Sequence, residues 1–323
     1  MARQAAEAAK ISSDIPASLR RELQSGLKDA KPFFTGLEDM ARTSFKAIVG
    51  TASATGLGIT TGLGLAVSVG SEFESAFAGV KKTVNASDYE LRQMRNDLRQ
   101  MARDELPQTV DELSAIAESA GQLGIQTKNI TNFTKTMADM DVSTDLSSEE
   151  AATDFAQFAN ITQMSQEYFG NLGSSVVALG NNMATTESGI VSMGMRIAAA
   201  GHQVKLSESD IMAYAASLSS VGIEAEAGGS AFSKMLVNLQ MATETGKGLD
   251  EYAKVAGMTG TEFKKAFRQD ATGAINAFLV GLNDTERNGK SAIAVLNDMG
   301  LTEVRLRDTL LRAANASDLF DDA

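Results

Sequence analysis

The stretch from Leu179 to Leu239 shows the clearest alternation of apolar and polar positions in the chain, and it predicts three successive helices. The first begins near Thr186 and ends at Gly201, a residue suited to the left-handed position that closes many helices. Apolar residues recur along it every three or four positions, as on one face of a helix. These residues are Ile190, Met193, Ile197 and Ala200.

The second predicted helix begins at Ser207 and stops at Gly222. The Ser207 hydroxyl and the Asp210 carboxylate can bind free backbone amides of its first turn. Ile223, just past the glycine, is placed to fold back onto the helix. The positions expected to face the core are Ile211, Ala215 and Leu218.

The third predicted helix has Gly228 and Gly229 near its start, where the missing side chains let another backbone come close. Its core-facing residues are Phe232, Met235, Leu236 and Leu239.

Three further helix starts are predicted where Ser or Thr precedes Glu by three residues, which is the spacing of a capping box. The pairs are Thr109 with Glu112, Ser147 with Glu150, and Thr259 with Glu262. Helices are predicted to close on glycines, namely Gly121, Gly201, Gly222, Gly257 and Gly300. Because these glycines are irregularly spaced, they indicate repeated helix ends and not the fixed period of a solenoid. Heptad spacing, typical of coiled coils, is seen at Leu91, Met94, Leu98 and Met101.

The chain is predicted to have three parts: an amphipathic helical arm at 1–46, an uncharged segment at 47–71, and a helical module at 72–323. The uncharged segment is long enough to cross a bilayer of about 30 Å as a helix. Small residues recur there at every fourth position, and such a stripe lets helix backbones pack in contact. It consists of Gly50, Ala54, Gly58, Gly62, Ala66 and Gly70. Two interpretations stay open: a helix buried against protein or against its own copies, or a helix that enters lipid.

Composition favours an all-α, multi-helix fold, because apolar residues make up 43% of the chain while there are only three prolines and no tryptophan. The absence of cysteine excludes disulfides and thiolate metal sites, and it agrees with assembly in a reducing cytoplasm. A net charge of −12 argues against a general or sequence-specific nucleic-acid binder, since phosphate contacts need clustered Lys and Arg.

Candidate reactive residues are few, so we expect no enzyme activity, no metal and no cofactor. His202 is the only histidine and is expected to face solvent or bind a carbonyl. Glu224 and Glu226 are the best pair of carboxylates, and two acids can divide the work of glycoside cleavage. Acids near a helix start are also stabilised by the helix dipole, which is the simpler explanation. The Gly228–Ser230 run is too short to cradle a phosphate.

Several short runs, in this order, resemble the core region of phage tail tape measure proteins. They are Leu179-Gly180-Asn181, Met183-Ala184-Thr185, Ala200-Gly201, Ala215, Val221-Gly222-Ile223 and Glu226-Ala227-Gly228-Gly229-Ser230-Ala231-Phe232. The resemblance extends more loosely from Phe73-Glu74 to Met299-Gly300 and the helix after it. The sequence departs from the family pattern at His202 and Lys205, where a small residue and often a glycine is expected.

The resemblance implies a virion protein that runs inside the growing tail tube, sets tail length during assembly in the host cytoplasm, and leaves with the DNA at infection, with a role at the host envelope. It implies as partners other copies of the chain, the tail tube protein, tail assembly chaperones, tail tip or baseplate proteins and the host membrane. The helices after residue 73 are too broken for a rod, so we expect a folded module, from a fragment or a short member of the family. The alternative is a membrane-inserting, pore-forming helical protein that uses 47–71. A third reading, a glycosidase, would require that Glu226→Gln abolish peptidoglycan cleavage.

Overall fold

The computed structural model describes residues 76–317 and 319, which lie within one compact unit, Phe73–Ala323. The predicted arm at 1–46 and the uncharged segment at 47–71, with its small-residue stripe, lie outside the described residues. Within the described part every regular element is helical and no strand occurs, so the all-α prediction is confirmed there. In the same part, none of the helices combines the length and the apolar character needed to span a bilayer.

The described chain begins with a helix at 76–83. The elements that follow are α4 (Asp88–Gln100), the π-helical turn η1 (Met101–Glu105), α5 (Val110–Gln122), α6 (Thr127–Ser143), α7 (Ser148–Thr162), the 3-10 turn η2 (Gln166–Tyr168), α8 (Phe169–Asn182), α9 (Glu187–Gln203), α10 (Glu208–Ser220), the π-helical turn η3 (Ala225–Gly229), α11 (Ser230–Thr245), α12 (Leu249–Val255), α13 (Gly260–Gln269), α14 (Ala271–Arg287), α15 (Ala292–Asp298) and α16 (Val304–Asn315).

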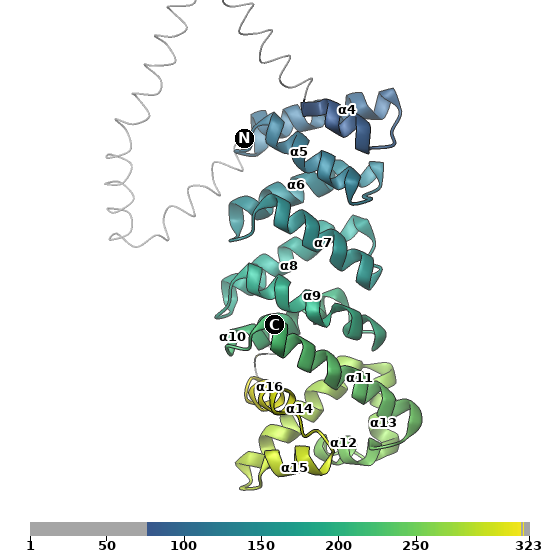
Figure 1. The fold of residues 1–323 in the computed structure, drawn as a ribbon, viewed down its shortest axis with the longest axis vertical. Coiled ribbons are helices and arrows are strands. Elements are labelled where there is room, and N and C mark those ends of the chain that lie inside the picture. The colour runs from purple at the N-terminus through teal and green to yellow at the C-terminus, as the bar shows by residue number, and fades with distance from the viewer. Residues whose placement is uncertain (1–75, 318, 320–323) are drawn as a thin grey trace, which may run out of the picture. The chain divides into compact units, whose positions relative to one another are not determined.

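Helices α4 to α11 form a two-layered stack (Figure 1), in which α5, α7, α9 and α11 make one layer and α4, α6, α8 and α10 the other. Within each layer every helix contacts the following helix of that layer, which is the next-but-one helix in the chain. Helices α4, α6, α8 and α10 begin at residues 88, 127, 169 and 208, about 40 residues apart, which is a usual length for a helical repeat. The prediction that the chain is not a solenoid is therefore wrong for α4–α11, because the repeat lies in helix starts and not in the glycines.

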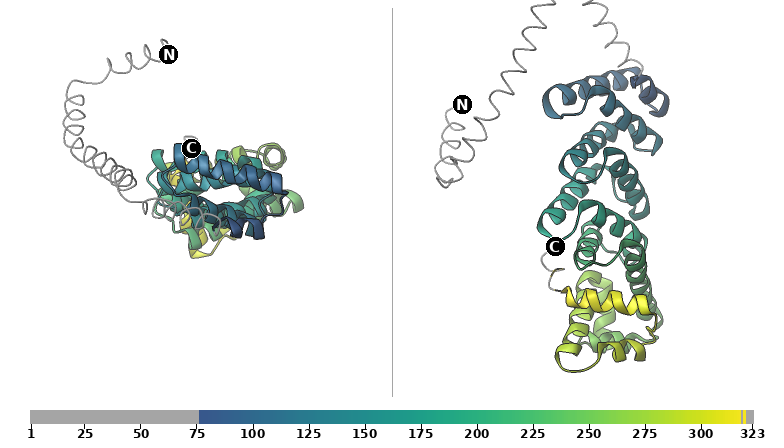
Figure 2. Two further views of the ribbon diagram at one scale, coloured as in Figure 1. Left: turned by 90° about the horizontal axis from the view of Figure 1, so that it is seen from above. Right: turned by 60° about the vertical axis from the view of Figure 1, so that its left-hand side comes forward.

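Helices α12 to α16 depart from this regular stacking. They pack mainly among themselves, with α12 against α11 and α14 against α13 and α16. The last helix, α16, returns to contact α10, η3 and α11, and the side view shows it as a yellow helix beside the green ones (Figure 2). The C-terminal helices thus close one end of the stack.

Buried aromatic residues join neighbouring helices within a layer and between the two layers. The Phe133 and Phe169 rings of α6 and α8 meet edge to face, with centroids 4.7 Å apart. Tyr214 of α10 packs against Phe232 of α11, with centroids 5.2 Å apart. Its hydroxyl donates to the Asn276 side chain of α14 over 2.7 Å, so this buried polar group is satisfied where α10 meets the C-terminal helices. The residues predicted to face the core in α9, α10 and α11 are buried, which confirms those helix faces.

The predicted capping boxes at Thr109, Ser147, Ser207 and Thr259 are all present. In α5, for example, the Glu112 amide donates to the Thr109 hydroxyl over 3.3 Å, and the Thr109 amide donates to the Glu112 carboxylate over 2.7 Å. A further capping box at Ser87 starts α4 and was not predicted.

Glycine ends three helices as predicted, since Gly222, Gly257 and Gly300 have positive φ values of 73°, 70° and 76°. The prediction is wrong at Gly121 and Gly201, which lie inside α5 and α9. There the missing side chain makes room for a neighbour.

Helix α9 ends at Gln203, and the left-handed residue that follows it is Lys205, a non-glycine residue with a φ of 65°. The Lys205 amide donates to the His202 carbonyl over 3.1 Å, and the Leu206 amide donates to the Gly201 carbonyl over 3.0 Å. This pair of bonds is the Schellman arrangement. Lys205 therefore occupies the left-handed position, where the family pattern leads one to expect glycine.

The π-helical turn η3 was also not predicted, and it contains Gly228 and Gly229. A Cβ on Gly228 would overlap the side chain of Ile223, and a Cβ on Gly229 would lie 2.6 Å from the Cβ of Arg196 in α9. Side chains, and not another backbone, therefore fill the space that the two glycines leave.

Candidate functional site

The two carboxylates singled out from the sequence lie on the surface at the start of η3. Glu224 and Glu226 are both exposed, and neither lines the two larger grooves described below. The Glu224 carbonyl accepts a hydrogen bond from the Gly228 amide over 2.8 Å, so this residue helps to shape the π-helical turn. Glu224 thus has a local structural role through its backbone, and both carboxylates lie at an open surface.

His202 lies in the last turn of α9 with its side chain exposed, as expected. Among residues 76–317 and 319 no group of three or more His, Cys, Asp or Glu side chains is arranged to hold a metal ion. Burial raises the pKa of Tyr252 to about 12, so this phenol of α12 stays neutral at physiological pH.

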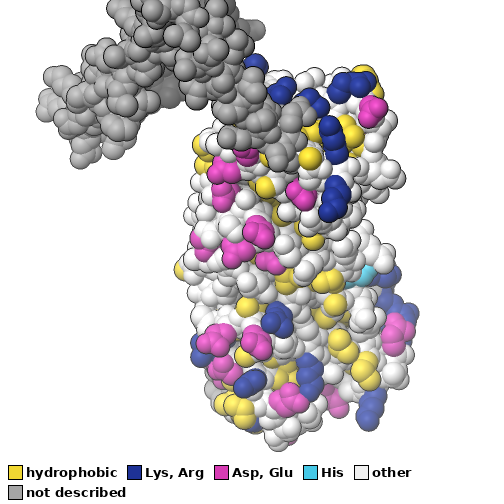
Figure 3. All heavy atoms as spheres, turned by 45° about the horizontal axis from the view of Figure 1, so that its top comes forward, with side chains coloured by type: hydrophobic (Ala, Val, Ile, Leu, Met, Phe, Trp, Pro, Cys, Tyr) yellow, Lys and Arg dark blue, Asp and Glu magenta, His cyan; other side chains and the backbone are white. Residues whose placement is uncertain are grey.

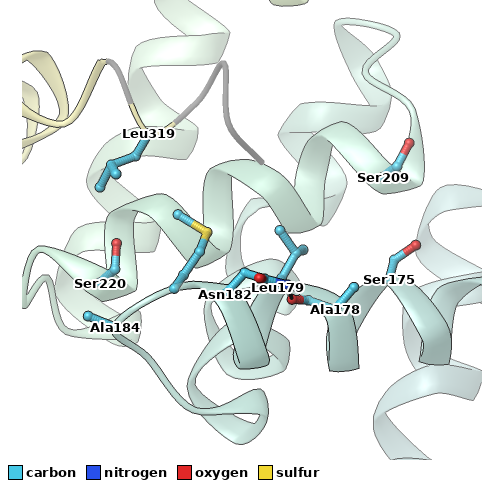
Figure 4. A pocket seen from close by; sticks show the side chains of 9 residues that line it. Ser175, Ala178, Leu179, Asn182, Ala184, Ser209, Ser220 and Leu319 are labelled. Carbon is cyan, nitrogen blue, oxygen red and sulfur yellow. Dashed lines mark hydrogen bonds between the residues drawn. The ribbon is translucent and has the colours of Figure 1, made fainter. Parts of the chain in front are cut away.

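A groove of about 670 Å³ lies between α8 and α10 and is here called the α8–α10 groove. Figure 4 shows α8 and α10 side by side along it, with Leu319 at one end. Among the residues that the structure describes, none that lines this groove is charged. Its lining residues are Ser175, Ala178, Leu179, Asn182, Met183, Ala184, Ser209, Ser220 and Leu319.

Polar groups in the α8–α10 groove bind their own helices. The Ser175 hydroxyl donates to the Asn171 carbonyl over 3.0 Å, and the Asn182 amide donates to the Ala178 carbonyl over 2.7 Å. The Ser220 hydroxyl donates to the Ser217 carbonyl over 2.9 Å. A small-molecule site usually has a few polar groups that converge on the ligand. These groups point back to the backbone, so the groove is better suited to a protein surface.

A second groove of about 610 Å³ lies on the other side of α8, against α6, and is here called the α6–α8 groove. Three of its lining residues are charged, and each is paired within the chain. Lys135 lies 3.0 Å from Glu105 and 3.9 Å from Asp139, and Glu167 lies 3.0 Å from Lys128. The part of this groove next to α8 is formed by Gly170, Gly173, Ser174, Val177 and Ala178.

Helix α8 thus has an outer face between two grooves, and Ala178 lines both of them. Gly170, Ser174 and Ala178 follow one another at every fourth position and are exposed. The sequence has no charged residue between Glu167 and Glu187. This charge-free run is visible in the sequence, but no functional role was predicted for it. We call the exposed strip Gly170, Ser174 and Ala178 the α8 face.

The α8 face contrasts with its surroundings. Residues 104–226 carry seventeen acidic and four basic side chains, whereas six basic residues lie between 76 and 103. In Figure 3 a row of Lys and Arg side chains lies at the α4 end, and basic and acidic side chains are mixed at the opposite end. Several of the acids cap helices. The Thr109 amide and hydroxyl lower the pKa of Glu112, and the Ser147 hydroxyl and amide lower the pKa of Glu150, so both stay ionised at neutral pH.

The comparisons with known proteins bear on the larger part of the chain. Neither the curated proteins nor the solved structures include a match to this sequence. The model of the family described as "Phage-related minor tail protein" matches residues 95–320, which span α4 to α16. The stacked helices and the resemblance noted in the sequence agree with this match. The chain therefore belongs to the phage-related minor tail protein family and has a structural role in the phage tail.

Proposed function

We propose that this tail protein is a tape measure, which sets the length of the tail tube during assembly and leaves with the DNA at infection. The observation that carries the proposal is the ordered set of motifs from Leu179 to Phe232, which lies inside the family match at 95–320. A role by shape and contact also fits the exposed positions of Glu224 and Glu226, and we propose that the chain is not an enzyme.

The geometry of the stack favours different roles for the stack and for the residues outside it. Each helix pair of about 40 residues adds one helix spacing of about 10 Å along the stack. The same residues in a continuous helix would extend about 60 Å. The stack therefore spans much less length per residue than a continuous helix does. We propose that it anchors the protein to other tail components and that residues outside it measure length.

The partners that fit this role are other copies, the tail tube protein, tail assembly chaperones and tail tip or baseplate proteins. The protein would then lie in the lumen of the tail tube. The host membrane is a further partner at infection if the uncharged segment at 47–71 inserts in lipid.

Tail length in assembled particles tests the proposal. Deletion of residues 1–46 is expected to shorten tails by about 70 Å if these residues form continuous helix, as measured by electron microscopy. A matched variant that replaces 1–46 with an unrelated helical sequence of equal length should restore the original tail length. Particles with tails of unchanged length after the deletion would contradict the proposal.

The alternative is a pore-forming protein, favoured only by the absence of charge from Ala47 to Ser71. If this segment inserted into lipid, its apolar side chains would be covered without a protein partner. Binding of the purified chain to vesicles, without assembly into tail-like particles, would support this alternative. Replacement of Gly58 and Gly62 by Lys should abolish such binding, since charges are costly in the bilayer centre.

A further inference from the structure

We propose that the α6–α8 groove binds a basic amphipathic helix of another protein, with the apolar face of that helix in the groove and its Lys and Arg side chains at the acidic rim. The inference goes beyond the proposed function and does not rest on it, because it follows from the surface of α6 and α8. Three features of this surface carry it: the floor of the groove, the charges around it, and the apolar side chains exposed at its ends.

The floor of the groove is formed by small and apolar side chains. Helices α6 and α8 lie close together at Gly173, where a Cβ would be 3.2 Å from the Thr136 side chain and 3.3 Å from the Met140 sulfur. Val177 and Ala178 continue the floor along α8. A volume of about 610 Å³ stays open above these residues. The apolar side chains of an incoming helix can fill it, as in other complexes in which a helix lies in a groove.

The hydroxyl groups of the groove do not converge on a ligand. Those of Thr136, Ser143 and Ser174 donate to the carbonyls four residues before them in their own helices, over 3.0, 2.7 and 2.8 Å. A small polar ligand would therefore find few free donors there. An apolar floor beside carboxylates instead suits a helix with one apolar face and basic side chains next to it.

The stretch that surrounds the groove carries charge of one sign. Residues 136–195, from the middle of α6 to the middle of α9, contain eight acidic residues and no Lys, Arg or His. Asp139 lines the groove, and the Glu187 carboxylate lies against Gly180 in the last turn of α8. An uncharged floor with a rim of one sign favours a partner of the opposite charge. The acids are Asp139, Asp141, Asp145, Glu149, Glu150, Asp154, Glu167 and Glu187.

Two lysines beside the groove do not reverse this charge. Lys135, which lines it, is shared by Glu105 at 3.0 Å and Asp139 at 3.9 Å. Lys128 lies 3.0 Å from Glu167, so these two charges offset each other. The five side chains together carry two positive and three negative charges. Because Asp139 has the longest of these contacts, its carboxylate is the one best placed to bind a basic residue of the partner.

Large apolar side chains are exposed at both ends of the groove. Val142, 58% exposed, precedes the lining residue Ser143, and Tyr168, 55% exposed, follows the lining residue Glu167. Exposed aromatic side chains are typical of protein interfaces. Along α6 the lining residues run from Asn132 to Ser143, a distance of about 16 Å or three helix turns. A partner helix of about three turns therefore matches the groove in length.

Charge also decides between classes of partner. The phosphates of nucleic acid or of anionic lipid would meet carboxylates at the rim and be repelled. A second copy of the chain is disfavoured, because a net charge of −12 makes two copies repel each other. A basic helix of another protein meets neither obstacle. Its Lys or Arg side chains would lie at Asp139, and its apolar face on Val177 and Ala178.

Binding of a synthetic helix to the purified chain tests the proposal. The probe is a fluorescent peptide of about twelve leucine and lysine residues, with leucine at every third or fourth position. Fluorescence anisotropy is expected to show saturable binding that weakens as salt is added. Two control peptides should bind about tenfold more weakly. One has the same composition in an order without an apolar face, and the other has glutamate in place of lysine.

Two matched pairs of variants locate the site. Ser174→Arg places bulk and a positive charge in the groove and should weaken binding by about tenfold or more. Met241→Arg adds the same charge at an exposed position of α11 and should leave binding unchanged. Asp139→Asn should weaken binding by about fivefold, whereas Glu251→Gln, at an exposed position of α12, should not weaken it. Circular dichroism checks that each variant is folded.

Four results would overturn the proposal. Two of them are no binding of the leucine–lysine peptide and equal binding of the peptide without an apolar face. The third is an equal loss in both members of either pair of variants, which would show attraction by net charge alone. The fourth is self-association of the original chain that Ser174→Arg abolishes, which would make a second copy the occupant. These assays do not depend on tail length, so the groove can fail while the tape measure function stands, and the reverse.

Discussion

Helices α8 and α9 follow each other in the chain and both carry small residues at helical spacing, but only one of the two faces is covered. In α9, Gly194, Ala198 and Gly201 are buried against α10. A Cβ on Gly201 would lie 2.8 Å from the Ile211 side chain. In α8, the Gly170, Ser174 and Ala178 positions are exposed.

The difference teaches what a small-residue face indicates. Glycine within a helix costs up to about 1 kcal/mol relative to alanine. Close packing of α9 on α10 recovers that cost within one chain. In α8 the exposed Gly170 has a looser environment, since a Cβ there would meet only the Thr136 hydroxyl, 3.8 Å away.

The largest expected effect is on the covered face. Gly201→Val should lower the free energy of unfolding by about 3 kcal/mol, because its side chain would overlap Ile211 in a packed core. Urea unfolding followed by circular dichroism measures this loss. The matched change Ala178→Val on the α8 face should alter stability by less than about 0.5 kcal/mol. Equal losses in the two variants would remove the distinction between the helices.

The next effect concerns how α9 ends. Lys205 has a φ of 65°, which is unfavourable for a side chain. Lys205→Gly should therefore raise the free energy of unfolding by about 1 kcal/mol, less a part lost to the greater freedom of unfolded glycine. Lys205→Ala keeps the strain and serves as the control. A gain of the same size in Lys205→Ala would assign the effect to the lysine charge.

A smaller effect is expected at the start of α9. The Ser188 amide donates to Asp145 over 2.9 Å. Burial raises the pKa of Asp145, but the hydrogen bonds from Ser188, Thr186 and the Asp145 backbone together outweigh burial and leave the pKa below its ordinary value. A carboxyl group with a lowered folded-state pKa stabilises the fold above its unfolded pKa of about 3.9, and this contribution is lost as pH falls through the folded pKa.

Asp145→Asn should therefore cost about 0.5 kcal/mol at neutral pH, a small value because the group is exposed to solvent. The difference between the variant and the original chain should vanish in acid, as thermal melts across pH would measure. A difference that persists unchanged below about pH 2 would show that ionisation of Asp145 is not involved.

The smallest effect on stability is expected for Ala178→Arg. Its side chain would point into solvent in the single chain, so thermal unfolding should change by less than about 0.5 kcal/mol. A large loss of stability would mean that Ala178 is packed within the chain, and α8 would then resemble α9.

Local signals in the sequence were sufficient for the helix starts. Thr109 with Glu112 and Ser147 with Glu150 form the predicted boxes, since both partners lie within one turn and need no distant residue. Helix ends were less predictable. Gly222 ends α10, whereas Gly201 does not end α9, because Ile211 from another helix requires the open space.

The stack and its open surface needed the structure. The repeat is carried by helix lengths and contacts, and different residues fill equivalent positions, so no repeated residue pattern reveals it. The α8 face also depends on which neighbours leave Ala178 uncovered. A charge-free run marks such a region, but only the positions of α6 and α10 separate an open face from a buried helix.

The stacked arrangement has a mechanical consequence. Each helix of α4–α11 relies on its nearest neighbours, so a pull from the α4 end would detach one pair after another, each against a modest resistance. The opposite end would behave differently, since α16 is tied back to α10 and α11 and would have to be released together with them. Threading through a narrow channel would therefore be easier with the α4 end leading.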